Sequence, residues 1–184
     1  MYRIVLVDDE ANMLSALRRV LMSIPTEDLD GERPEVETYV SAEEALRRAR
    51  TMPIDLVISD YRMPEMSGVD FLTQVIEAQP DVARLILSAY ADIDAVMNAI
   101  NKVQVFRFIS KPWHDVELKS AVTQALSIRK LQIDNRRLAD TVRQQTGRLS
   151  KQEAALRRLE KESPGITQLK LADDGGILID DEDL

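Results

Sequence analysis

Short apolar runs rich in β-branched residues alternate, over about the first two thirds of the chain, with longer stretches whose apolar positions recur every three or four residues. The short runs are typical of buried strands and the longer patterns of amphipathic helices. Strands are predicted at residues 3–7, 35–39, 54–59, 83–87 and 104–109, and helices at 11–23, 42–50, 68–78 and 92–101. This alternation predicts an α/β fold, a flavodoxin-like doubly wound sheet of five parallel strands in the order 2-1-3-4-5, whose functional edge lies beyond the carboxyl ends of the strands.

Two local features refine this prediction. The stretch Pro25–Pro34, PTEDLDGERP, is acidic and rich in turn residues, and we interpret it as a solvated surface loop with no assigned function. Ser41 precedes the second helical pattern and Glu44 follows three residues later, which is the arrangement of a helix N-cap with a capping box.

A heptad repeat begins at Ile128, where the last helix of the globular region continues without a break. The a positions are Ile128, Asn135, Val142, Leu149 and Leu156, and the d positions are Leu131, Leu138, Gln145, Gln152 and Leu159. The stripe is about 47 Å long at ~1.5 Å per residue, too long to be covered by a domain of this size, so it requires a partner helix. Asn135 at an a position favours a parallel two-stranded register, and Arg148 at g is placed to pair with Glu153 at e of a second chain. The pattern predicts a parallel homodimer through a coiled coil.

Charge divides the chain into three regions. Residues 1–128 carry 13 Lys+Arg and 21 Asp+Glu, residues 129–162 carry 10 and 5, and residues 163–184 carry 1 and 6, which together give the net charge of −8. A Ser-Pro-Gly sequence at 163–165 ends the helical pattern. We therefore expect a globular domain over 1–127, a coiled-coil dimerisation helix over 128–162, and an acidic tail over 163–184 that is either a β-hairpin or disordered.

The composition excludes several classes of protein. The chain has no cysteine, which rules out disulfides and thiolate metal sites. Its net negative charge lacks the overall basic surface of proteins that bind nucleic acid without sequence preference. No apolar stretch approaches the length of a membrane span, and the run Ile4–Val7 is too short for a signal peptide. We therefore expect a cytoplasmic protein whose partners include neither nucleic acid nor a membrane.

Chemically related side chains follow the carboxyl ends of the predicted strands. Asp8 and Asp9 follow the first strand, Asp60 the third, Ser88 the fourth and Lys111 the fifth. Taken alone, Asp8 and Asp9 would equally suit a helix cap. Because the strands of a doubly wound sheet end at one edge, we expect these groups to converge on a single site. Crowded carboxylates need a hard cation such as Mg²⁺, and a Lys beside it suits phosphoryl chemistry with a carboxylate as the nucleophile.

Four motifs, in order and spacing, carry a resemblance to a known family. VLVDDE at the first strand, DYRMPEMSG at the third, LSAYAD at the fourth and FRFISKPW at the fifth resemble the receiver domain of bacterial two-component response regulators, over residues 1 to about 127. The resemblance implies that Asp60 accepts a phosphoryl group from a sensor histidine kinase. It also implies that Asp9 and Asp60 are Mg²⁺ ligands, that Asp8 helps to hold the ion through water, and that the backbone carbonyl of Arg62 is a further ligand.

The resemblance further implies a conformational switch. Ser88 would hydrogen-bond a phosphoryl oxygen, and Lys111 would pair with the phosphate from a Lys-Pro sequence whose peptide bond is commonly cis in the family. Phe108 matches the aromatic residue that turns inward as the serine moves. A separate effector protein that prefers one arrangement of this surface would then read the signal as a difference in affinity.

No recognisable output domain follows the coiled coil, so the expected function is a response regulator that signals to a separate effector. It is not expected to be an enzyme, beyond Mg²⁺-dependent self-phosphorylation and self-dephosphorylation. Two alternatives stay open, a constitutive coiled-coil scaffold and a phosphate-sink receiver without an output of its own. Of the residues near the site, Trp113 is expected to pack against the core and His114, the single histidine, to lie on the surface.

Overall fold

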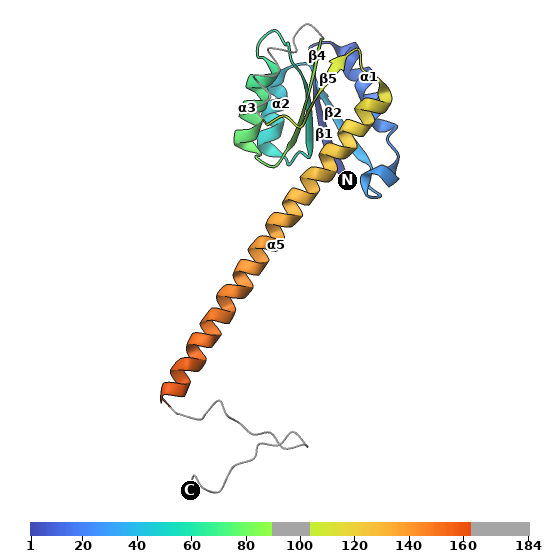
Figure 1. Ribbon diagram of the computed structural model, residues 1–184. Helices are drawn as coiled ribbons and strands as arrows, with labels where there is room; N and C mark the ends of the chain where they lie inside the picture. The colour runs from blue at the N-terminus through green and yellow to red at the C-terminus, as the bar shows by residue number, and fades with distance from the viewer. Residues whose placement is uncertain (90–103, 163–184) are drawn as a thin grey trace, which may run out of the picture. The chain divides into compact units, whose positions relative to one another are not determined.

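The computed structural model describes residues 1–89 and 104–162, and in these residues a parallel five-stranded sheet is flanked by helices (Figure 1). The strands are β1 (Tyr2–Val7), β2 (Pro34–Tyr39), β3 (Leu56–Asp60), β4 (Ala83–Ala89) and β5 (Arg107–Lys111); the helices are α1 (Ala11–Met22), the 3₁₀ helix η1 (Thr26–Leu29), α2 (Ala42–Thr51), α3 (Gly68–Ala78) and α5 (Asp115–Glu162). The strand order is β2-β1-β3-β4-β5, and all four pairings are parallel. The predicted doubly wound fold is confirmed.

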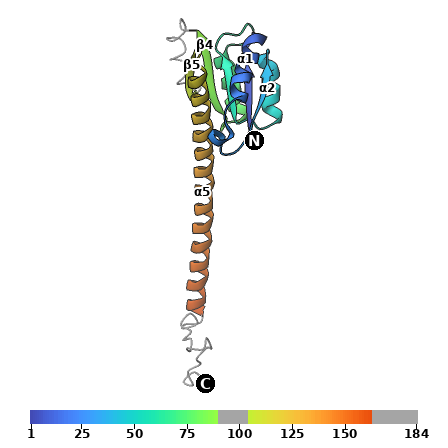
Figure 2. The same ribbon diagram turned by 90° about the vertical axis from the view of Figure 1, so that its right-hand side faces the viewer.

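Helices cover both faces of the sheet. Helices α2 and α3 lie on one face, and α1 with the first part of α5 lies on the other (Figures 1 and 2). Alternate residues of β1 therefore enter different cores: Ile4 and Leu6 pack in the cluster with α1 and α5, whereas Val5 and Val7 pack in the cluster with α2 and α3. Burial on both faces explains why the central strands are continuously apolar.

The predicted boundaries differ from the observed ones mainly at the fifth strand. The prediction began this strand at residue 104, but β5 begins at Arg107 because Gln104 adopts a left-handed conformation with φ of 47°. Ser41 occupies the N-cap position of α2 as predicted, although its side chain makes no capping hydrogen bond there. The helix predicted at 92–101 and the tail at 163–184 lie outside the described residues.

The stretch Pro25–Pro34 is mostly exposed, as the predicted surface loop would be, but it also contains a buried residue that the prediction did not include. It contains η1, and Leu29 at the end of η1 is only 2% exposed and belongs to the core cluster of α1 and α5. In the sequence, a single apolar residue between acidic ones gives no periodic pattern that would predict its burial. The turn that follows is made by Asp30, in the left-handed region with φ of 54°, and by Gly31.

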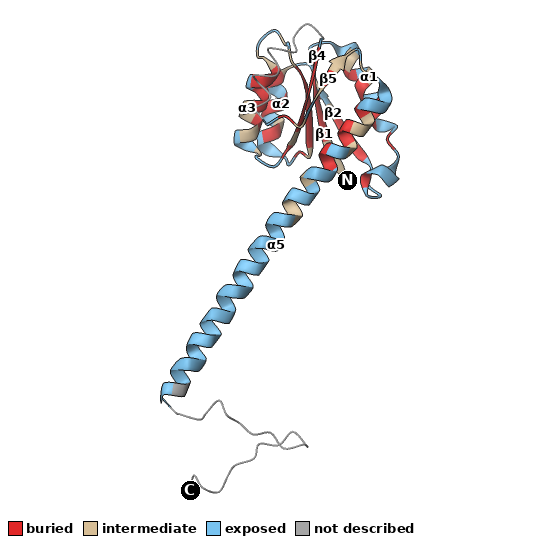
Figure 3. Ribbon diagram, in the orientation of Figure 1, coloured by how far each residue is buried: buried red, intermediate tan, exposed pale blue. Residues whose placement is uncertain are grey.

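Helix α5 changes along its length, from a part with one buried face to a part that is almost entirely exposed (Figure 3). Its first turns bury Leu118, Ala121, Val122, Ala125 and Leu126. From Ile128 onward the apolar residues at the heptad a and d positions, which we call the seam, are 41–63% exposed. Exposed apolar residues in such a row are typical of a surface that binds another protein segment. The chain divides into two compact units, Met1–Asp134 and Asn135–Leu184. The described part of the second is helical to Glu162, the residue at which the predicted coiled-coil helix ends. Within the described ranges, no helix has the length and apolar content that crossing a membrane requires.

Candidate functional site

Three carboxylates gather where strands β1 and β3 end. The two strands pair directly, which places Asp8, just after β1, beside Asp60, the last residue of β3. Carboxylate oxygens of Asp8, Asp9 and Asp60 all lie within 4.8 Å of one another. Asp8 is fully buried and Asp60 is 7% exposed, whereas Asp9 is open to solvent. One exposed and two buried carboxylates at this spacing form an oxygen donor set that fits a small hard cation such as Mg²⁺.

Lys111, the last residue of β5, pairs with both buried acids. Its Nζ lies 2.7 Å from Asp8 Oδ2 and 2.6 Å from Asp60 Oδ1. Burial by itself would lower the pKa of the Lys111 ammonium, but its hydrogen bonds to Asp60 and Asp8 hold that pKa above its ordinary value. Lys111 is therefore a fixed positive charge at the site. The peptide bond that joins it to Pro112 is cis.

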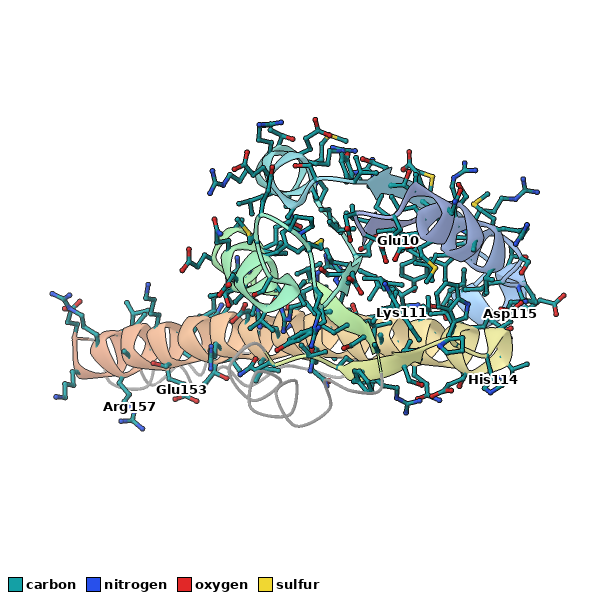
Figure 4. The ribbon with its side chains drawn as sticks, turned by 90° about the horizontal axis from the view of Figure 1, so that it is seen from above. Glu10, Lys111, His114, Asp115, Glu153 and Arg157 are labelled. Atoms are coloured by element: carbon teal, nitrogen blue, oxygen red, sulfur yellow. The ribbon has the colours of Figure 1, made fainter. Side chains whose placement is uncertain are left out.

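Asp60 is shaped by opposing effects. Burial raises the pKa of its carboxyl, and the nearby negative charge of Asp8 adds to this, while the hydrogen bond and charge of Lys111 oppose it; the net shift is upward. Asp8 is oriented from its own side, because its Oδ1 accepts a hydrogen bond from the backbone N–H of Glu10 at 2.9 Å. Figure 4 labels Glu10 and Lys111, which contact Asp8 from the residue just before α1 and from the end of β5.

The other predicted site residues lie around this centre. Ser88 is 1% exposed on β4, and its hydroxyl donates to the carbonyl of Ala89 at 3.3 Å. Phe108 on β5 is half-buried against the core of α2 and α3. Arg62 is exposed two residues beyond Asp60. The structure thus brings the acids and Lys111 into contact, and places Ser88 and Phe108 on the two strands beside them.

Two residues that follow β5 behave as expected. Trp113 packs against the core cluster of α1 and α5, and His114 is exposed at the start of α5 (Figure 4). Neither contributes to the acidic centre in the described part of the chain.

Sequence reasoning missed two sets of residues. A Cβ at Gly68 would lie 2.0 Å from the backbone carbonyl oxygen of Asp60, so only glycine allows the start of α3 to pass so close to the site. At the opposite end of the sheet, Arg129 of α5 pairs with Asp55 just before β3. The sequence held a signal for the first, because a glycine stands eight residues after Asp60 at the start of a helical pattern, but none for the second.

Comparison with known families and proteins agrees with this geometry. A family model described as response regulator receiver domain matches residues 4–123. The hydrogenase transcriptional regulatory protein HoxA of Cupriavidus necator is 34% identical over 135 residues, which cover 73% of this chain and 26% of that protein. The response regulator protein TodT of Pseudomonas putida is 30% identical over 150 residues, 82% of this chain and 62% of that protein. The chain thus spans between about a quarter and two thirds of the length of these relatives.

Solved structures show the same likeness. A response regulator receiver domain protein from Clostridium thermocellum superposes with a TM-score of 0.61 at 30% identity, over 72% of this chain and 99% of that one. An uncharacterized protein from Neptuniibacter caesariensis gives a TM-score of 0.64 at 36% identity, over 73% and 93% of the two chains.

Proposed function

We propose, on the premise that this chain belongs to the response regulator receiver family, that it is a two-component response regulator in which Asp60 is phosphorylated by a sensor histidine kinase. The observation that carries the proposal is the Asp8–Lys111–Asp60 cluster, in which one ammonium lies 2.7 Å and 2.6 Å from two buried carboxylates. Such a cluster combines a nucleophile with the positive charge that a transferring phosphoryl group requires.

The reaction follows from the residues present. A carboxylate oxygen of Asp60 attacks the phosphorus of a phosphohistidine; the new P–O bond forms as the P–N bond breaks, and the imidazole leaves with its electron pair. Lys111 then exchanges its contact with the Asp60 carboxylate for the phosphoryl oxygens, and the buried hydroxyl of Ser88 turns toward one of them. We assign no further enzymatic activity to the chain.

The acids support a Mg²⁺ site. Asp8, Asp9 and Asp60 would hold the ion, with the backbone carbonyl of Arg62 as a further ligand. When bound, it would neutralise charge on the phosphoryl group. Asp8 is held by the Glu10 N–H, so one of the donors is fixed in orientation before any ion binds.

We infer that the switch signals by changing the surface around Phe108. A phosphoryl group adds roughly −1.5 to −2 charges, which draws Ser88 toward it and opens room for Phe108 to turn inward. Phe108 is half-buried against the core of α2 and α3. An inward turn of its ring would therefore change the part of the ring that a partner protein contacts. A separate effector protein would read this change.

The exposed seam of α5 supports a parallel coiled-coil homodimer. Leu138, Val142 and Leu149, at a d and two a positions of the repeat, are 63%, 59% and 59% exposed in the single chain. Leu149→Glu should reduce the molar mass measured by light scattering to that of a monomer, whereas Ser150→Glu, at the neighbouring b position outside the a/d seam, should leave it unchanged. A dimer that survives Leu149→Glu would contradict this part of the proposal.

The phosphorylation proposal is tested with phosphoramidate, a small donor with a P–N bond, in the presence of Mg²⁺. Intact-mass measurement should show one phosphoryl adduct on the wild type and on Asp140→Asn, a control at an exposed helix position, and none on Asp60→Asn. An adduct that persists on Asp60→Asn, or one that never forms on the wild type, would overturn the assignment. The second result would favour a scaffold that needs no phosphorylation.

A further inference from the structure

Arg129, on α5, is anchored to the ends of two strands. Its Nη1 lies 2.6 Å from Asp55 Oδ1, its Nε donates to the carbonyl of Asp81 at 2.9 Å, and its Nη2 donates to the carbonyl of Ile54 at 3.5 Å. The side chain is only 18% exposed. The planar guanidinium of Arg129 donates to three acceptors in two loops. It therefore fixes both the orientation and the distance of α5 relative to those loops, which a flexible ammonium group would not.

The acceptor of Arg129 is itself tied into the sheet. Asp55 Oδ2 accepts the backbone N–H of Arg3 on β1 at 2.7 Å, and the Asp55 carbonyl accepts the N–H of Ala83 at the start of β4 at 3.0 Å. Through Asp55, Arg129 therefore contacts the amino-terminal ends of β1, β3 and β4 together. We call the contacts of Arg129 with Ile54, Asp55 and Asp81 the strand clamp.

The next residue attaches the helix on a second side. Lys130 Nζ lies 2.9 Å from Asp30 Oδ2, and the hydroxyl of Tyr2 donates to the same oxygen at 2.8 Å. Asp30 stands in the left-handed turn after η1, so this contact joins α5 to the segment that the sequence suggested was only a surface loop. Both partners are half exposed, and we therefore regard this contact as an aid to the strand clamp rather than its equal.

The strand clamp lies within the first turn of the heptad seam. Ile128 is the first a position and Leu131 the next d position, and they are 41% and 61% exposed. Arg129 and Lys130 stand between them at b and c, so the same turn of helix is fastened to the sheet on one side and presents its apolar seam on another.

The clamped strands are the ones that carry the proposed phosphoryl site. Asp55 immediately precedes β3, which ends in Asp60, and Asp81 lies two residues before β4, which holds Ser88 near its other end. A parallel strand packed on both faces moves as a stiff unit, so a shift at one end is felt at the other.

We propose that Arg129 is a positioning residue that couples the phosphoryl site to the start of the α5 seam. This inference rests on the proposed function and names its route: a change at Asp60 and Ser88 passes along β3 and β4 to the strand clamp, and through Arg129 to the turn that begins with Ile128. The proposal is supported by the contacts of one guanidinium with Asp55 and Asp81, which stand just before β3 and β4.

The test is hydrogen exchange of the full chain with and without Mg²⁺ and beryllofluoride, which mimics an aspartyl phosphate. In the wild type, exchange should slow in β3 and β4, and the amides of residues 124–134 should change at least about twofold. Arg129→Gln should keep the response in β3 and β4 and lose it at 124–134. Arg143→Gln removes an equal charge whose ion pair, with exposed Asp140, lies within the same helix, and it should respond as the wild type does.

The outcomes separate the two proposals. If no strand of the wild type responds to beryllofluoride, the proposed function fails. If the strands respond but residues 124–134 do not, or respond equally in Arg129→Gln, the coupling role of Arg129 is refuted while the phosphoryl site stands. Because the readout is a difference between two states of each variant, a uniform loss of stability in Arg129→Gln does not imitate the expected result.

Discussion

Replacing Lys111 with Met removes the cation that holds two acids together. The Lys111 side chain is 14% exposed, and the side chains of Asp8 and Asp60 that it contacts are 0% and 9% exposed. Removing one partner of a buried ion pair typically costs about 3–5 kcal/mol of folding free energy. Because the Lys111 side chain is partly open to solvent, we expect a loss at the lower end of this range, about 3 kcal/mol. With a urea m-value of about 2 kcal/mol/M, the midpoint of unfolding should fall by about 1.5 M.

The matched control is Lys130→Met, the same substitution at an ion pair whose two side chains are both 50% exposed, where a far smaller shift is expected. Urea unfolding curves, measured at one protein concentration with EDTA and then with millimolar Mg²⁺, also test how Mg²⁺ changes the midpoint of each variant. Because Lys111→Met leaves the acids without their own counter-ion, Mg²⁺ should raise its midpoint more than that of the wild type. A Lys111→Met midpoint no lower than that of Lys130→Met would refute the reasoning.

Three further results are expected. Gly68→Ala should destabilise by about 2–4 kcal/mol in thermal unfolding, since its Cβ would lie 2.0 Å from a backbone carbonyl oxygen, whereas Gly147→Ala, with open space around it, should stabilise by about 0.5–1 kcal/mol. The hydrogen bond from Arg48 lowers the pKa of Glu37 below 4.5, so the stability advantage over Glu37→Gln should be complete above pH 4.5 and decline as pH falls through the lowered pKa; an advantage independent of pH would contradict this. Burial and a hydrogen bond to a carboxylate raise the pKa of Tyr2 to about 12, so ultraviolet titration should show a late tyrosinate step, present in the wild type and absent in Tyr2→Phe.

The strands and the acidic centre could be predicted because each depends on a short stretch of sequence and one rule. Continuous apolar runs indicated strands covered on both faces, and the register of β1 with β3 then brought Asp8 beside Asp60 without any knowledge of side-chain conformation. Lys111 followed by the same rule, as the residue at which β5 ends. The fold thus follows from the apolar runs, and the centre from where charged residues stand relative to the strand ends.

The residues that were missed depend on contacts between distant segments. Leu29 lies in an acidic stretch with no periodicity, and its burial is decided by the space left beside α1 and α5. Arg129 and Asp55 are separated by 74 positions, and each alone is an ordinary charged residue at the edge of an element. Nothing in local pattern distinguishes Arg129 from Arg143, which is 80% exposed and pairs within its own helix.

The placement of the strand clamp follows from how tightly this sheet is packed. β3 is buried along its whole length, and Leu85, Ile86 and Leu87 of β4 are fully buried, so these strands cannot bend or change register without opening both cores. In the proposed switch, a phosphoryl group at Asp60 acts on the described part of the sheet by displacing side chains at the strand ends or by moving a strand as a unit. The first mode would reach the surface through the proposed switch residues Ser88 and Phe108. The second would reach α5 through the core that the helix shares with β3 and β4 and, at the far ends of the strands, through Arg129, whose polar contacts in the described part of the chain join the helix to the residues just before both β3 and β4.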